Sequence, residues 1–124
     1  MAFLPNNLKV LKFGNNFNKP VDHLPLNLEI LEFGEFFDKS VHNLPANLKK
    51  IVFGYYFNRP VKRLPRGLEI LIFGHKFNKP IGNIPNSVKI LEFGYSFDRD
   101  IQILPESLET CLLYTSPSPR DMSA

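Results

Sequence analysis

A motif of twenty residues recurs along the chain without a single insertion. Each full copy has Leu-Pro or Ile-Pro, then Phe-Gly, then a Phe followed by Asn or Asp. Five full copies occupy residues 4–103, and a sixth begins at Leu104. Self-similarity at a fixed period indicates a solenoid, in which each repeat forms one coil and contacts its neighbours. Twenty residues are too few for a helical hairpin but fit a coil that carries a strand.

One short strand is expected just before the glycine of each copy. Leu11 and Phe13 alternate with Val10 and Lys12, the period-two pattern of a strand with one buried face. Parallel strands about 4.8 Å apart would stack equivalent side chains into columns, and the coils are stable only as a stack. The sequence therefore predicts a β-rich solenoid. Its predicted core columns begin, in the first copy, at Leu8, Leu11, Phe13, Phe17, Val21 and Leu24.

The other recurring positions are explained by backbone geometry. Gly14 and its copies follow the strand, where a tight turn requires a positive φ or the absence of a side chain. Gly67 replaces the Asn or Ser of the turn after the proline, which suggests a left-handed conformation. A column of Asn and Asp is expected to cap backbone groups and form a hydrogen-bonded ladder between coils. A metal site is the weaker alternative, because its two carboxylates are separated by two coils. This column contains Asn18, Asp38, Asn58, Asn78 and Asp98.

The repeat read from Leu24 is LPLNLEILEFGEFFDKSV, and from Leu44 it is LPANLKKIVFGYYFNRPV. Over residues 4–110 this pattern closely resembles the FNIP repeat, a leucine-rich-repeat-like unit of social amoebae and giant viruses. The resemblance implies a right-handed coil with one short parallel strand per 20-residue repeat, and a protein-interaction module. Many family members carry an F-box ahead of the array, which implies a ubiquitin-ligase substrate receptor. In this sequence the repeats begin at the fourth residue, without an F-box-like segment ahead of them.

The period fails at Cys111, where the chain continues as CLLYTSPSPRD and then MSA. Residues 111–121 resemble one translated reading frame of a transposon-end adapter from sequencing-library preparation. The Pro/Ser-rich composition predicts disorder, and a native segment that caps the last coil is the alternative. We therefore expect a repeat array over residues 1–110, a disordered non-native tail over 111–124, and a fragment of a longer repeat protein.

Charged residues form two rows with different patterns. The first row alternates in sign and should support the register by about 0.2–1 kcal/mol per pair. It contains Lys9, Glu29, Lys49, Glu69, Lys89 and Glu109. The second row has one sign and offers an edge for an anionic partner. It contains Lys19, Lys39, Arg59, Lys79 and Arg99. A formal net charge of only +3, without stacked aromatic residues beside the cations, argues against nucleic acid.

Positions that differ between copies are those available for recognition. They are the outward strand residues and the two residues after each glycine, a pair rich in aromatic side chains with polar groups, as interfaces are. Strand propensity and ordinary loop variation are the alternative explanation. The predicted partner-binding residues are Phe36, Tyr55, Tyr56, Ile70, Ile72, His75, Ile90 and Tyr95.

No catalytic or cofactor-binding motif is recognisable. His23, His42 and His75 occupy three different repeat positions and form no constellation with a nucleophile. Phosphate-loop, metal-ligand and nucleophile-elbow motifs are missing from the sequence. The sequence therefore predicts a non-catalytic protein–protein interaction scaffold without cofactors. The alternatives are a structural spacer and the substrate-recognition part of an F-box adaptor.

The compartment is indicated only indirectly. No apolar run approaches a membrane span, and the first residues lack the pattern of a signal peptide. Cys111 is the single cysteine, so an internal disulfide is impossible. A reducing compartment, the cytoplasm, is therefore favoured.

Overall fold

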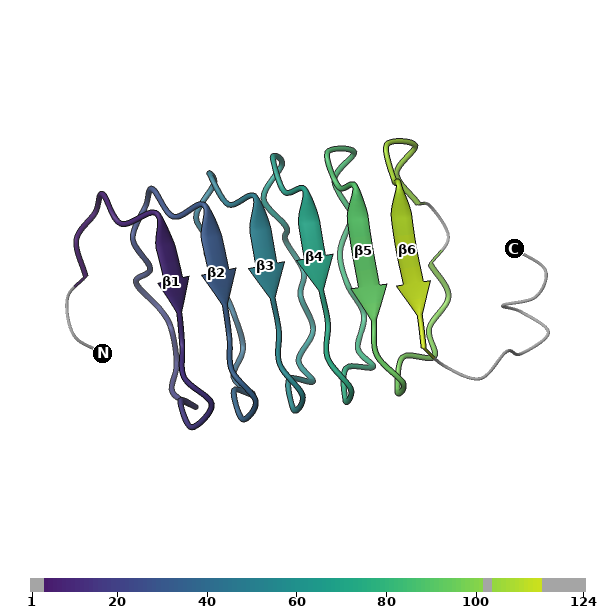
Figure 1. Cartoon of the computed structure of the whole chain (residues 1–124), viewed down its shortest axis with the longest axis horizontal. Helices are drawn as coiled ribbons and strands as arrows, with labels where there is room; N and C mark the ends of the chain where they lie inside the picture. The colour runs from purple at the N-terminus through teal and green to yellow at the C-terminus, as the bar shows by residue number, and fades with distance from the viewer. Residues whose placement is uncertain (1–3, 102–103, 115–124) are drawn as a thin grey trace.

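The computed structural model describes residues 4–101 and 104–114, which form a solenoid with one strand in each coil. The strands pair in sequence order in a single parallel sheet. The sheet forms one wall of the solenoid, and the segments that return to the next strand form the opposite wall (Figure 1). The predicted leucine-rich-repeat-like solenoid is confirmed. The strands are β1 (Val10–Lys12), β2 (Ile30–Glu32), β3 (Lys50–Val52), β4 (Ile70–Ile72), β5 (Ile90–Phe93) and β6 (Thr110–Leu113).

Neighbouring strands pair without any shift of register. Leu31 lies opposite Ile51, and Ile51 lies opposite Leu71, so the twenty-residue period of the sequence becomes the period of the sheet. The central residue of each strand from β2 to β4 is buried, whereas the residues on either side are only partly buried. This alternation is the expected one for a sheet with a single buried face.

Phenylalanine columns fill most of the space between the two walls. The ring of Phe53 stacks on that of Phe57 in its own coil, with the centroids 4.0 Å apart, and on that of Phe73 in the next coil, at 5.3 Å. All six predicted columns are found in or against the buried core, which confirms the predicted core. In the first coil, Leu8 and Phe13 are only partly buried, because that coil packs against a neighbour on one side.

The glycine column is required for close packing and not for a special backbone conformation. Among the described glycines none has a positive φ, so the left-handed conformation expected at Gly67 is wrong. A Cβ added to Gly34 would lie 2.5 Å from the carbonyl oxygen of Gly14 in the coil before it, whereas Gly67 has no atom within 4 Å of such a Cβ. Coils stacked at strand spacing bring the two backbones into contact, so a side chain at Gly34 would push the coils apart.

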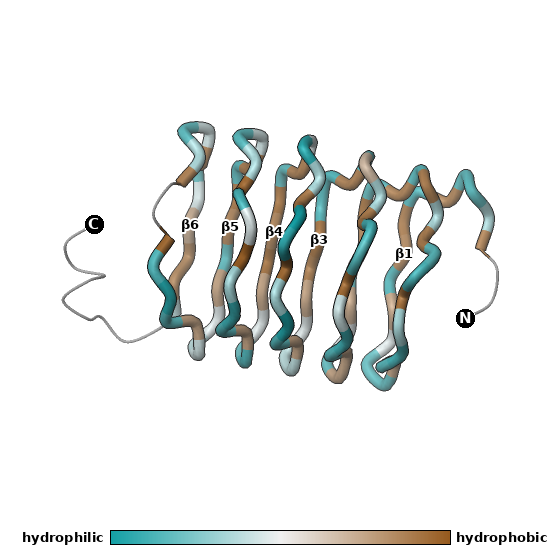
Figure 2. Tube along the Cα trace, turned by 180° about the vertical axis from the view of Figure 1, so that it is seen from behind, coloured by the Kyte–Doolittle hydropathy of each residue, from teal (hydrophilic) through white to brown (hydrophobic). Residues whose placement is uncertain are grey.

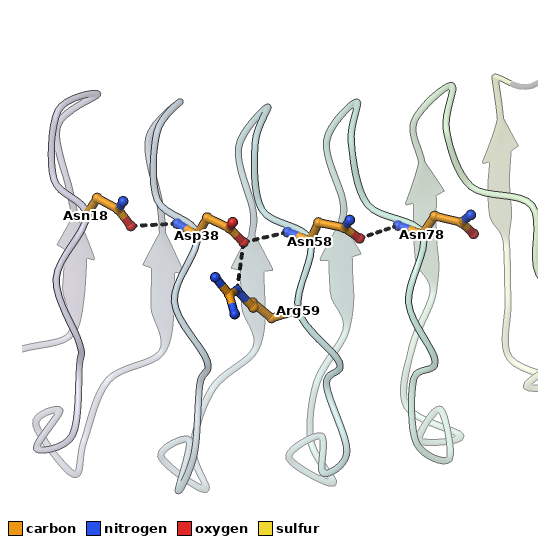
Figure 3. A network of polar contacts seen from close by, with 5 residues as sticks. All are labelled: Asn18, Asp38, Asn58, Arg59 and Asn78. Atoms are coloured by element: carbon orange, nitrogen blue, oxygen red, sulfur yellow. Dashed lines mark hydrogen bonds and ion pairs between the residues drawn. The ribbon is translucent and has the colours of Figure 1, made fainter.

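The Asn and Asp column forms the predicted hydrogen-bonded ladder (Figure 3). The Oδ1 atom of Asn18 accepts a hydrogen bond of 2.8 Å from the backbone N–H of Asp38, and Oδ1 of Asp38 accepts one of 3.0 Å from Asn58. Two further bonds, Asn78 to Asn58 at 2.9 Å and Asp98 to Asn78 at 3.0 Å, continue the ladder. The first four side chains of the column thus each accept a hydrogen bond from the backbone of the next coil.

The strand β6 extends beyond the predicted end of the repeat array. Cys111 pairs with Leu91, and Leu113 pairs with Phe93, so the first residues of the expected disordered tail belong to the sheet. Disorder from Cys111 onward is therefore wrong for residues 111–113. The edge of β5 presents N–H and C=O groups that a following extended segment can pair with, whatever its side chains. Residues 115–124 lie outside the described part of the chain.

Candidate interaction surface

The turns that follow the glycines are held at the spacing of the coils by backbone hydrogen bonds. The N–H of Phe36 donates to the carbonyl of Asn15 at 3.0 Å, and the N–H of Tyr56 donates to that of Glu35 at 3.0 Å. The N–H of Lys76 makes the same bond to Tyr55 at 2.9 Å. These turns lie along the lower edge of the solenoid in Figure 1. Equivalent side chains in successive turns therefore lie next to one another.

Aromatic side chains of these turns stack from coil to coil outside the core. The rings of Tyr55 and His75 lie nearly parallel, at 7°, with centroids 4.7 Å apart, and His75 is 5.4 Å from Tyr95. In the neighbouring row, Phe36 stacks on Tyr56 at 5.3 Å. Tyr55 and Tyr56 join the two rows through an edge contact of 4.7 Å. We call these five residues the aromatic ladder.

The aromatic ladder is accessible to solvent although its rings contact one another. Tyr95 retains 62% of its surface, and Phe36 retains 45%. Tyr55 and Tyr56 are also exposed, and His75 is partly buried between its neighbours. Ring-to-ring contact restricts the rotamers of these side chains, so less conformational entropy remains to be lost when a partner binds.

The outward face of the sheet divides into a charged part and an apolar part. Around β1 and β2, Glu32 forms ion pairs with Lys12 at 3.8 Å and with Lys50 at 3.3 Å. From β3 to β5 the pairs Val52–Ile72 and Ile70–Ile90 bring apolar side chains together. We call Val52, Ile70, Ile72 and Ile90 the apolar strip. Its strands lead directly into the turns that carry the aromatic ladder.

The structure places all eight predicted partner-binding residues on these two adjoining surfaces. Phe36, Tyr55, Tyr56 and Tyr95 are exposed, while His75 and the three isoleucines are partly buried. Whether they bind a partner stays a prediction.

Sequence reasoning missed Tyr114, whose ring lies 5.6 Å from that of Tyr95. The carboxylate of Glu92, mainly through its charge, raises the pKa of the Tyr114 phenol. The period places Tyr114 at the position of the repeated glycine and not in the variable pair after it, so no signal in the sequence pointed to this residue.

The two charged rows differ in how far they are paired. In the alternating row, Lys9 and Glu29 are 3.3 Å apart, and Lys49 and Glu69 are 4.0 Å apart. In the row of one sign, Nε of Arg59 contacts Oδ1 of Asp38 at 3.1 Å. The second row is thus not uniformly available to an anionic partner.

The remaining candidate sites have little chemistry to offer. Within residues 4–101 and 104–114 no group of three His, Cys, Asp or Glu side chains could hold a metal ion. The Oδ1 atoms of the Asn and Asp column accept backbone hydrogen bonds instead (Figure 3). Across the same described ranges, no helix is long and apolar enough to cross a membrane.

Comparisons with known proteins agree with the architecture. The model of the FNIP repeat matches residues 2–36, 37–76 and 77–111. The crystal structure of CroV588, described as a novel circular LRR protein, superposes with a TM-score of 0.61 and 29% identity over 90% of this chain. The chain spans 24% of that protein's length. No curated protein matches. A leucine-rich-repeat-like coil is compatible with a repeat scaffold for protein interaction. With three consecutive matches over most of its length, the chain belongs to the FNIP repeat family.

Proposed function

We propose that this chain is a non-catalytic scaffold that binds another protein through the aromatic ladder and the apolar strip. The observation that carries the proposal is the stack of rings from Tyr55 through His75 to Tyr95, in which both tyrosines are exposed and no ring belongs to the buried core. Solenoids commonly bind through such extended, repeated surfaces. Tyrosine is also enriched where proteins meet, since its ring buries apolar area while its hydroxyl finds a polar partner.

The distribution of charge favours the middle and later coils as the centre of contact. Glu32 already pairs with Lys12 and Lys50, so a partner that covered this end would have to desolvate an ionic network. Over the apolar strip, binding would remove mainly hydrocarbon surface from water, which is favourable. Tyr55, Tyr56 and Tyr95 flank this strip and are the expected energetic anchors.

A capture experiment with a matched control tests the proposal. The test variant combines Tyr55→Ala, Tyr56→Ala and Tyr95→Ala, and the control combines Val10→Ala and Leu26→Ala. The control side chains are exposed by 44% and 69% and lie outside both proposed contact surfaces. Immobilised proteins would be incubated with cell extract, and captured proteins quantified by mass spectrometry. Circular dichroism would verify that all variants remain folded.

We expect the parent and the control to capture the same protein, and the test variant to lose it. A photoreactive amino acid at position 95 should crosslink to that protein, whereas one at position 26 should not. Equal capture by the test variant would refute this surface. If no protein binds the parent saturably, the spacer alternative is favoured instead.

A further inference from the structure

One return segment differs from all the others in its charge. Residues 58–67 contain four cations and no carboxylate, although the whole chain has a formal net charge of only +3. The remainder of the chain is therefore close to balanced. In the view from behind, the wall of return segments includes this markedly hydrophilic stretch between β3 and β4 (Figure 2). The four cations are Arg59, Lys62, Arg63 and Arg66.

Three of these cations have no ion-pair or hydrogen-bond partner for their side chains among the residues that the structure describes. Arg59 contacts Asp38, but the exposed side chains of Lys62, Arg63 and Arg66 make no ion pair or hydrogen bond to any residue that the structure describes. The return segments on either side, 38–47 and 78–87, contribute a single carboxylate, that of Asp38. Like charges this close together repel one another unless an external anion compensates them.

Two depressions flank this segment and open among the same cations. The first has a volume of about 360 Å³ and is bordered by Lys62 and Arg63 together with Ser40, His42 and Asn43 of the preceding coil. These side chains supply N–H and O–H donors from two coils to one place. The second depression, of about 450 Å³, is bordered by Leu64, Arg66, Asn83, Ile84, Pro85, Asn86 and Ser87. We call Lys62, Arg63 and Arg66, together with these two depressions, the cationic patch.

We propose that the cationic patch binds an extended acidic protein segment, rich in Asp or Glu. A chain lying across the coils would pass from one depression to the other and place carboxylates beside Lys62, Arg63 and Arg66. Arginine is suited to this, because its planar guanidinium can bind a carboxylate through two parallel hydrogen bonds.

Nucleic acid is a poorer fit to the same surface. Neither depression is bordered by a Phe or Tyr side chain, and the imidazole of His42 is the single ring there on which a base could stack. Three unpaired cations also supply few phosphate contacts compared with those of nucleic-acid-binding proteins.

The cationic patch is distinct from the surface proposed above. Its three cations belong to the segment 58–67. This segment returns from β3 to β4 along the wall opposite the sheet (Figures 1 and 2). The two proposals can therefore fail independently, and the variant lacking Tyr55, Tyr56 and Tyr95 should retain binding to an acidic segment.

Binding of a defined probe to the full chain tests the inference. The probe is a fluorescent peptide of alternating Glu and Ser, measured by anisotropy at low ionic strength, where screening is weak. A peptide with Gln in place of Glu is its neutral counterpart. The test variant combines Lys62→Gln, Arg63→Gln and Arg66→Gln. The control variant combines Lys9→Gln, Lys49→Gln and Lys89→Gln, which removes the same net charge outside both depressions.

We expect the parent and the control to bind the acidic peptide and not its neutral counterpart, and the test variant to bind it roughly tenfold more weakly or worse. Equal losses in both variants would mean that net charge alone attracts the peptide, and would overturn the inference. It would also be overturned if the parent does not bind the peptide. A single-stranded oligonucleotide of equal charge that binds this patch more tightly than the peptide would assign the patch to nucleic acid instead.

Discussion

The carbonyl oxygen of Gly34 lies in the space that a side chain on Gly54 would need. The same relationship links Gly54 to Gly74 and Gly74 to Gly94 in the following coils. Because the obstructing atoms belong to the backbone, they cannot move aside without separating two coils and disturbing the strand pairing. The glycine column therefore permits the coils to approach one another as closely as the strand pairing requires.

We predict that Gly54→Ala lowers the free energy of unfolding by roughly 1–3 kcal/mol, as overpacking does. Gly67→Ala is the control, because no atom lies within 4 Å of a Cβ there and its φ is not positive. That change should leave stability unchanged or raise it by up to about 1 kcal/mol, since alanine restricts the unfolded chain. Urea unfolding measures both values, and equal losses would contradict the packing explanation.

Phe53→Ala should reduce stability by about 3–5 kcal/mol, because its ring is 1% exposed and contacts rings in three coils. Phe36→Ala removes the same atoms from a ring that is 45% exposed. This substitution should lower the free energy of unfolding by about 1 kcal/mol, which is the typical contribution of a contact between surface aromatic rings. Thermal and urea melts can be compared side by side. A similar loss of stability in both variants would mean that the two rings lie in equivalent environments, which would contradict the structure.

Asn58→Ala should lower the free energy of unfolding by roughly 1–3 kcal/mol, because the backbone N–H of Asn78 loses its acceptor in a part-buried position. Asn58→Asp keeps an oxygen in the same place, as Asp38 does in the coil before it, and should cost clearly less. Urea unfolding of the two variants tests the role of the ladder. If Asn58→Asp lowers the stability as much as Asn58→Ala does, the acceptor oxygen at this position does not stabilise the fold.

Deleting residues 111–124 should lower the melting temperature, because Leu91 and Phe93 lose the strand that pairs with theirs. Deleting residues 115–124 keeps all of β6 and should leave the melting temperature close to that of the parent. Differential scanning calorimetry of both truncations provides the comparison. Identical melting of the parent and the variant without residues 111–124 would show that β6 does not stabilise the sheet.

Much of this fold was predictable from the sequence. The unbroken period predicted the coils, and the alternation around Leu11 and Phe13 predicted a strand with one buried face. The side-chain ladder through Asn18 was also predictable, because short amide and carboxylate side chains at equal spacing meet the backbone of the next coil. These features depend on local pattern and on repetition, and both can be recognised from the amino-acid sequence alone.

Other features depended on distances between coils. At Gly54 the residue type was foreseeable, but its reason was a backbone from twenty residues earlier and not its own φ. At Cys111 the broken motif suggested disorder, yet the open edge of β5 pairs with the chain through backbone groups that every residue carries.

By itself, the sequence determined the repeat, the solenoid and the columns of the core, because periodic burial follows from periodic side chains. Only the tertiary structure decided which outward residues form a common surface. Tyr55, His75 and Tyr95 are twenty residues apart along the chain and stack only because the coils hold them one above another. Lys62 and Arg63 likewise border a depression with His42 only after two return segments lie side by side. Surface chemistry arises from such juxtaposition, and it depends on the spacing and register between coils.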